Sequence, residues 1–149
     1  MDVGFYHCTR SSPETVVPQL AEKAMAANYR LLVRVAGPEE AGRLDELLWN
    51  YRADSFLPHG VAGVGDEDAR QPLLISTDFS PVNDATLAIS MSQGLPFGEA
   101  KFDRVLLLFD GSDEEETRRA RGHWRAVAER EDVSRTYWQQ MERGWSKSA

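Results

Sequence analysis

The chain has 149 residues, 42% of them hydrophobic and 28% charged, with a formal net charge of −7. This is the size and composition of one domain with a sizeable core, and no apolar run approaches the roughly 20 residues that span a bilayer. The acidic balance disfavours tight direct binding to a phosphate backbone, which requires a basic surface. We therefore expect a single domain over residues 1–149, without membrane association.

The N-terminus and the cysteine usage predict where the protein is found. Residues 1–5 lack the basic region and long apolar stretch of a secretory signal. Cys8 is the single cysteine, so no internal disulfide can form, which agrees with a reducing compartment. We expect a cytoplasmic protein.

The first half of the chain alternates predicted strands and helices. Residues 4–8 and 30–35 are short apolar strands. One helix follows Ser12 as N-cap with Pro13 at its first position, and another begins at Gly37-Pro38 and continues to Tyr51. Residues 52–71, with several Gly, Asp and Pro, predict a long loop.

The second half predicts three strands over residues 73–76, 87–90 and 105–109, then a helix. Ser112 and Glu115 form the pattern of a capping box, and Glu114 and Glu115 can pair with Arg118 and Arg119 one turn later. Residues 136–139 predict an edge strand, followed by a polar tail from about residue 140. The alternation predicts a three-layer α/β/α Rossmann-like domain with a largely parallel sheet.

Trp49 lies away from the buried stripe of its helix. At about 100° per residue, its side chain projects roughly 140° from that of Leu44, towards the polar side. Phe56 and Leu57 follow in what should be a surface loop. Two interpretations remain open: the aromatic group is a protein-binding hot spot, or another element covers Trp49.

Signals for catalysis are absent. Residues 60–65 are glycine-rich, but they neither join a strand to a helix nor carry the residues of a phosphate loop. His7, His59 and His123 lack metal-ligand spacing. His7 and Cys8, adjacent on a strand, point to opposite faces, which favours a buried structural Cys8 over a Cys-His nucleophile pair. We expect no cofactor, no metal and no catalytic residue.

Several motifs resemble the chi subunit family of bacterial DNA polymerase III holoenzyme. The most specific block runs from Arg43 to Trp49 and continues through Ser55-Phe56-Leu57-Pro58-His59-Gly60. Supporting matches are Phe5-Tyr6-His7, residues 107–111, residues 120–125 and Thr136-Tyr137-Trp138. Together they cover nearly the whole chain.

The resemblance implies a Rossmann-like accessory subunit, itself non-catalytic, of an assembly with DNA-directed DNA polymerase (nucleotidyltransferase) activity in DNA replication. It implies an adaptor with two partners, a psi-type clamp-loader subunit and the acidic C-terminal tail of single-stranded-DNA-binding protein, so that contact with DNA is mainly indirect. The psi-type surface would use Trp49, Phe56, Leu57, Pro58 and His59. The tail site would use Arg121, Trp124 and Phe109, closed by Trp138, with Thr117 where the family often has a lysine and Arg118 as a substitute charge.

A free carboxylate beside an apolar side chain needs a guanidinium beside an apolar slot, which agrees with Arg121 and Trp124. Other interpretations remain open. Arg121 could instead be a solvated partner of Glu114 or Glu129. An α/β enzyme that uses a nucleotide, or a direct single-stranded nucleic-acid binder acting through the arginines of residues 118–125, is the alternative function.

Overall fold

Eight strands form one sheet in the part of the chain that the computed structural model describes, residues 1–51, 57–97 and 101–149. Their order across the sheet is β3-β4-β2-β5-β6-β1-β7-β8, and only the β7–β8 pair is antiparallel. The strands are β1 Asp2–Cys8, β2 Leu31–Arg34, β3 Gly60–Val61, β4 Leu73–Ser76, β5 Leu87–Met91, β6 Arg104–Asp110, β7 Ser134–Gln140 and β8 Trp145–Lys147. The predicted parallel α/β sheet is confirmed.

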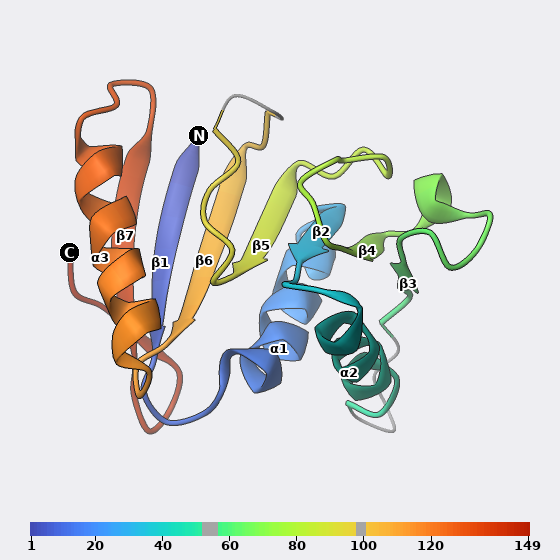
Figure 1. Cartoon of the computed structure of the whole chain (residues 1–149), viewed down its shortest axis with the longest axis horizontal. Helices are drawn as coiled ribbons and strands as arrows, with labels where there is room; N and C mark the ends of the chain where they lie inside the picture. Colours follow the sequence, from blue (N-terminus) through green and yellow to red (C-terminus); the bar gives the residue numbers. More distant parts are fainter. Residues whose placement is uncertain (52–56, 98–100) are drawn as a thin grey trace.

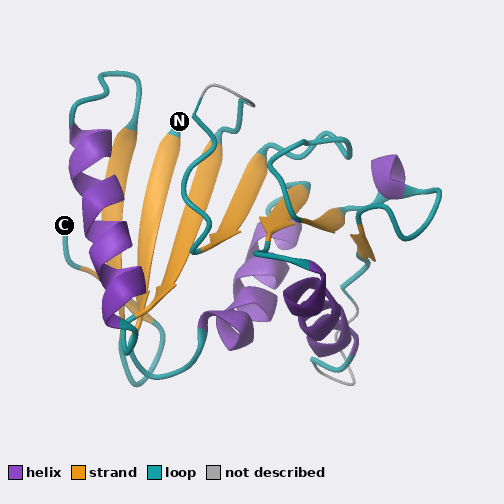
Figure 2. Cartoon of the chain, viewed as in Figure 1, coloured by secondary structure: helices purple, strands orange, loops and turns teal. Residues whose placement is uncertain are grey.

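The helices cover the two faces of the sheet unequally. They are α1 Pro13–Ala26, α2 Pro38–Trp49 and α3 Glu114–Ala128, with a short 3-10 turn at Asp68–Arg70. The buried residues of α1 and α2 join one core cluster, whereas Ala120 and Val127 of α3 join another with Val3 and Phe5 of β1. The layers are therefore α1 and α2, the sheet, and α3, and Figures 1 and 2 show α3 and α2 at opposite ends of the sheet.

Strand β1 lies between β6 and β7 and contributes to both faces. Val3 and Phe5 pack towards α3, while Tyr6 and Cys8 pack towards α1. Successive side chains of a strand point to opposite faces, so a strand that has helices on both sides needs apolar side chains on both faces. Cys8 is buried, as expected, and burial raises the pKa of its thiol to about 12.

The prediction that the strand after α3 is an edge strand was wrong. Strand β7 has β1 on one side and β8 on the other, and β8 lies within the expected polar tail. Trp145 of β8 packs edge-to-face on Tyr6, with ring centroids 5.0 Å apart. A strand of three residues is too short to show a recognisable alternation of apolar and polar side chains in the sequence. Its pairing with β7 depends instead on tertiary contacts such as that of Trp145 with Tyr6.

The expected capping of α3 by Ser112 was also wrong. Asp113 is the N-cap, and its Oδ1 accepts hydrogen bonds from the backbone N–H groups of Glu115 and Glu116. Ser112 instead donates to the side chain of Asp110. The ion pair on this helix joins Arg118 to Glu115, three residues apart, and not the expected residues four apart.

The loop expected over residues 52–71 contains β3 and the 3-10 turn in its described part. The backbone N–H of Gly63 donates to Asp68 Oδ2 at 2.9 Å, so the glycine-rich stretch uses this amide within its own turn. Among the described residues, no helix has the length and apolarity that crossing a bilayer requires.

Replacing Asp113 with Ala should lower the free energy of unfolding by about 0.5–2 kcal/mol, since two backbone N–H groups lose their acceptor. Urea denaturation measures this change. The matched control is Ser112→Ala, which should change stability by less than about 0.5 kcal/mol because its hydroxyl makes one solvent-exposed hydrogen bond, to Asp110. A larger loss in the Ser112 variant would contradict this assignment of the cap.

Candidate functional site

Trp49, the last residue of α2, is 54% exposed in the isolated chain. The helix buries Ala41, Leu44 and Leu48 on its other side, as the apolar spacing predicts. The second interpretation, in which another element covers the indole, is therefore wrong for the monomer. Large exposed aromatic groups on a helix face are typical of protein-binding surfaces.

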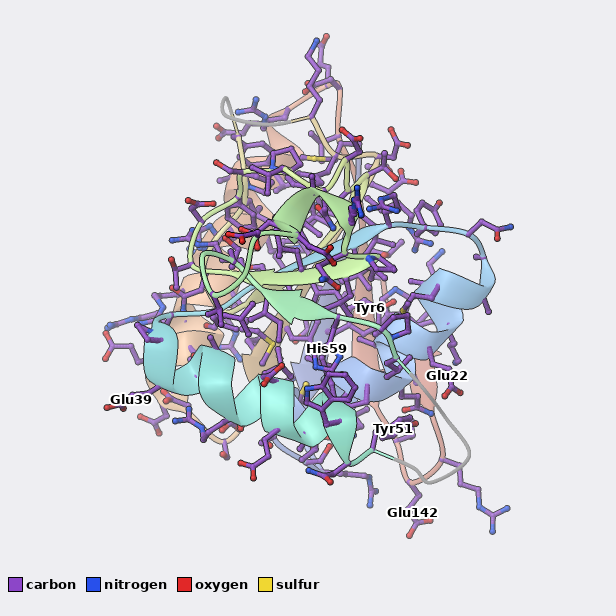
Figure 3. The ribbon with its side chains drawn as sticks, turned by 90° about the vertical axis from the view of Figure 1, so that its right-hand side faces the viewer. Tyr6, Glu22, Glu39, Tyr51, His59 and Glu142 are labelled. Carbon is purple, nitrogen blue, oxygen red and sulfur yellow. The ribbon has the colours of Figure 1, made fainter. Side chains whose placement is uncertain are left out.

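The indole of Trp49 lies against the buried imidazole of His59, with ring centroids 4.6 Å apart. His59 Nδ1 lies 2.6 Å from the carbonyl oxygen of Leu57, and Nε2 lies 3.0 Å from Asp45 Oδ1. A neutral imidazole donates one of these hydrogen bonds, and an imidazolium donates both. Figure 3 shows His59 beside α2. Because both ring nitrogens face hydrogen-bond acceptors, the imidazole is held in place and supports the exposed indole of Trp49.

The other residues predicted for this surface differ in exposure. Leu57 is buried and Pro58 is half-buried. Leu57 belongs to the core cluster beneath α2, so the prediction that it takes part in a partner contact is corrected: it anchors the loop that carries His59. Phe56 lies outside the described residues. We refer to Trp49 and Pro58, with the buried His59 supporting them from beneath, as the α2 surface.

A second candidate surface is an open groove of about 660 Å³ along the first turns of α3. Its lining residues are Gly111, Glu114, Glu115, Thr117, Arg118 and Arg121. Arg118 is held by Glu115 at 2.9 Å, whereas Arg121 is exposed and forms no ion pair with any described residue. The alternative pairing of Arg121 with Glu114 or Glu129 is thus not formed, and its guanidinium is available to an anion.

Trp124 lies one turn beyond Arg121 and is half-buried. It packs edge-to-face on Phe5 and on Tyr137, with ring centroids 5.2 Å and 5.7 Å away. The guanidinium of Arg135 lies 3.9 Å from the centroid of the indole and donates to the carbonyl oxygen of Trp124 at 2.7 Å. The indole is therefore held by aromatic and cationic neighbours while part of it remains exposed.

The structure does not bring every predicted tail-site residue to this groove. Phe109 is only 1% exposed, so it forms the floor beneath Tyr137 and not a contact surface. Trp138 stacks on Tyr6 on the opposite face of the sheet, so the prediction that it closes the site is wrong. Thr117 is half-buried, and its hydroxyl donates to the carbonyl oxygen of Asp110. We refer to Arg121, Trp124, Tyr137 and Arg135 as the α3 surface.

Sequence reasoning missed Tyr137 and Arg135. Alternation along β7 places Tyr137 on the face opposite to Trp138, so that signal was present in the sequence. Burial raises the pKa of the Tyr137 hydroxyl, and the positive charge of Arg121 opposes that rise. Among the described residues, no three His, Cys, Asp or Glu side chains form a cluster that could hold a metal ion.

The fold and these two surfaces define a three-layer α/β domain with exposed aromatic groups at both ends of its sheet. Residues 1–133 match the protein family described as "DNA polymerase III chi subunit, HolC". The chain therefore belongs to the DNA polymerase III chi subunit family, whose members are replication accessory subunits.

Individual relatives agree with this family. The chain is 30% identical over 106 residues to "DNA polymerase III subunit chi" of Pseudomonas aeruginosa, covering 69% of this chain and 72% of that protein. It is 38% identical over 55 residues to "DNA polymerase III subunit chi" of Escherichia coli, 37% of either chain. It is 24% identical over 87 residues to "Probable DNA polymerase III subunit chi" of Rickettsia prowazekii, covering 58% of this chain and 52% of that one.

Replacing Trp49 with Ala should change the free energy of unfolding by less than about 1.5 kcal/mol, because more than half of the side chain is already exposed to solvent. The neighbouring Leu48→Ala variant should lose about 2–5 kcal/mol, because it leaves a cavity under α2. Urea denaturation of both variants tests the orientation of the helix. Equal losses would contradict it.

Proposed function

We propose that the chain is a non-catalytic adaptor of the DNA polymerase III holoenzyme. In this proposal the α2 surface binds a psi-type clamp-loader subunit, and the α3 surface binds the C-terminal tail of single-stranded-DNA-binding protein. The protein thereby connects the polymerase assembly to coated single-stranded template, and its contact with DNA is indirect.

The observation that carries the proposal is the separation of two surfaces that contain aromatic side chains. One lies at α2 and the other at α3, and Figure 1 shows these helices at opposite ends of the sheet. The α2 surface presents the indole of Trp49 on a rigid support. The α3 surface combines a guanidinium that lacks an ion pair among the described residues with a half-buried indole. An adaptor requires two such surfaces that do not overlap, so that both partners bind together.

The chemistry of the α3 surface favours a peptide terminus. A terminal carboxylate and an adjacent apolar side chain need a bidentate donor beside an apolar contact, and Arg121 and Trp124 lie one helical turn apart. Glu114 and Glu115 line the other end of the groove, so the carboxylate is expected at the Arg121 end. Arg118 shares its charge with Glu115 in an exposed ion pair, whereas Arg121 has no ion pair among the described residues, so we assign the anion to Arg121.

A synthetic peptide that copies the last residues of single-stranded-DNA-binding protein should bind the wild-type chain in calorimetric titration. Arg121→Ala should weaken binding by about 1.5–3 kcal/mol, the contribution of a hydrogen bond to a charged group. Arg70→Ala is the matched control, because it removes the same charge from an exposed pair with Glu67 near the β3 edge of the sheet. The same peptide with an amidated C-terminus should also bind weakly, and unchanged affinity for it would contradict recognition of the carboxylate.

Partner capture from the cells of origin tests the α2 surface. Trp49→Ala should lose the psi-type subunit, by at least about tenfold in retained partner, while it retains binding of the tail peptide. Arg121→Ala should show the reverse pattern. Val82→Ala, which alters another exposed hydrophobic side chain, is the control and should retain both partners. Loss of both partners from either single variant would contradict two separate surfaces.

A further inference from the structure

The carboxyl ends of β1 and β6 form a topological switch point. The two strands are parallel neighbours, yet β1 leads into α1 on one face and β6 leads into α3 on the other. The two connections therefore diverge at the carboxyl ends of these strands. In open α/β sheets, ligands bind in crevices at such points. The residues at this edge are His7 on β1 and, after β6, Gly111, which lines the α3 groove.

His7 is held in this crevice by aromatic contacts and one hydrogen bond. Its ring stacks on Phe109, with centroids 4.9 Å apart and planes inclined by 15°. Its Nδ1 lies 2.9 Å from the hydroxyl of Tyr137. Nε2 forms no hydrogen bond with any residue that the structure describes, so one polar position of the ring is available.

Gly111 brings the groove close to this ring. A Cβ atom at position 111 would lie 2.5 Å from His7 Nε2 and 3.0 Å from the carbonyl oxygen of Cys8, so a side chain does not fit. Gly111 and Arg121 line the same groove, and His7 Nε2 lies next to Gly111, behind this lining.

The charges that face His7 favour an anion. Burial lowers the pKa of His7 below its ordinary value, and the positive charge of Arg121 lowers it further. Arg121 on α3 and Tyr137 on β7 are the titratable side chains that face the ring from neighbouring elements. The negative charges of Asp110 and Glu116 instead raise the pKa of Cys8, the next residue of β1. An anion beside Arg121 would oppose the effect of Arg121 and favour the imidazolium.

We infer that His7 is a second anchor for the peptide carboxylate bound at Arg121, with Nε2–H as the donor and Tyr137 holding the ring through Nδ1. This inference rests on the proposed function and adds a residue to its tail site. Neutral His7 donates from Nε2 while Nδ1 accepts from the Tyr137 hydroxyl. The imidazolium donates from both nitrogens, with Tyr137 as acceptor, and adds a positive charge beside the carboxylate. Tail binding is therefore coupled to uptake of a proton from solvent by His7.

The test is calorimetric titration of the tail peptide between about pH 8 and about pH 5.5, the range over which histidine changes its charge. Wild-type affinity should increase as the pH falls, by up to about tenfold once the pH is well below the pKa of free His7, if the bound carboxylate raises that pKa by about one. His7→Gln, which keeps a neutral donor, should bind with an affinity that is constant over this range. His7→Leu should bind more weakly than His7→Gln throughout.

The matched control is His123→Gln. His123 is a half-buried histidine of α3 whose pKa is also lowered by burial and by a neighbouring arginine, Arg119. This variant should retain the pH dependence of the wild type. NMR titration of the His7 ring gives a second readout: adding the peptide should raise the pKa of His7 and leave that of His123 unchanged.

The outcomes separate this inference from the proposed function. Binding that depends on Arg121 but has the same affinity across the pH range, with an unchanged pKa of His7, overturns the role of His7 and leaves the tail site standing. Absence of peptide binding by the wild type at every pH overturns both.

Discussion

The parallel pairing of β1 with β6 on one side and with β7 on the other determines where the α3 surface can form. Its register places His7 opposite Phe109 and Tyr137 opposite Phe5. Phe5, Phe109 and Tyr137 belong to the apolar cluster on which Trp124 of α3 packs. Because hydrogen bonds fix that register, a shift of one residue would turn His7 and Tyr137 to the opposite face. The positions of the aromatic rings are thus set by the backbone of the sheet.

Both candidate surfaces share one physical arrangement, in which an indole ring packs on side chains that are themselves held by hydrogen bonds or ring contacts. Trp49 lies on His59, whose nitrogens face Leu57 and Asp45. Trp124 is held by Phe5, Tyr137 and Arg135. A ring that is already ordered loses little conformational entropy when a partner covers it, so more of the contact energy contributes to affinity. This preorganisation suits an adaptor that depends on small contact areas.

The uneven distribution of charge agrees with recognition of a peptide terminus. Residues 112–149 hold eight acidic and eight basic side chains, so the net charge of −7 comes from residues 1–111. On α3 the acids occupy the N-terminal end, where Asp113 caps the helix and Glu115 holds Arg118. Arg121 then lies beyond the acidic turn and faces His7 and Tyr137. The proposed anion site is therefore compatible with an acidic protein, because Asp113 and Glu115 are engaged in contacts of the helix itself.

The sequence by itself determined the parallel α/β architecture and the outward direction of Trp49, because each depends on the local period of a helix or strand. The roles of Arg121 and Trp124 came from the family resemblance and stay a proposal. The sequence did not determine the cap of α3, the pairing of β8 or the face of Trp138, although alternation already separates Trp138 from Tyr137. The contacts of His59 with Asp45 and of His7 with Tyr137 join residues 14 and 130 positions apart. Only the tertiary structure decides such contacts. The first follows from how the segment before β3 packs on α2, and the second from the pairing and register of β1 and β7. Local periodicity carries no information on either.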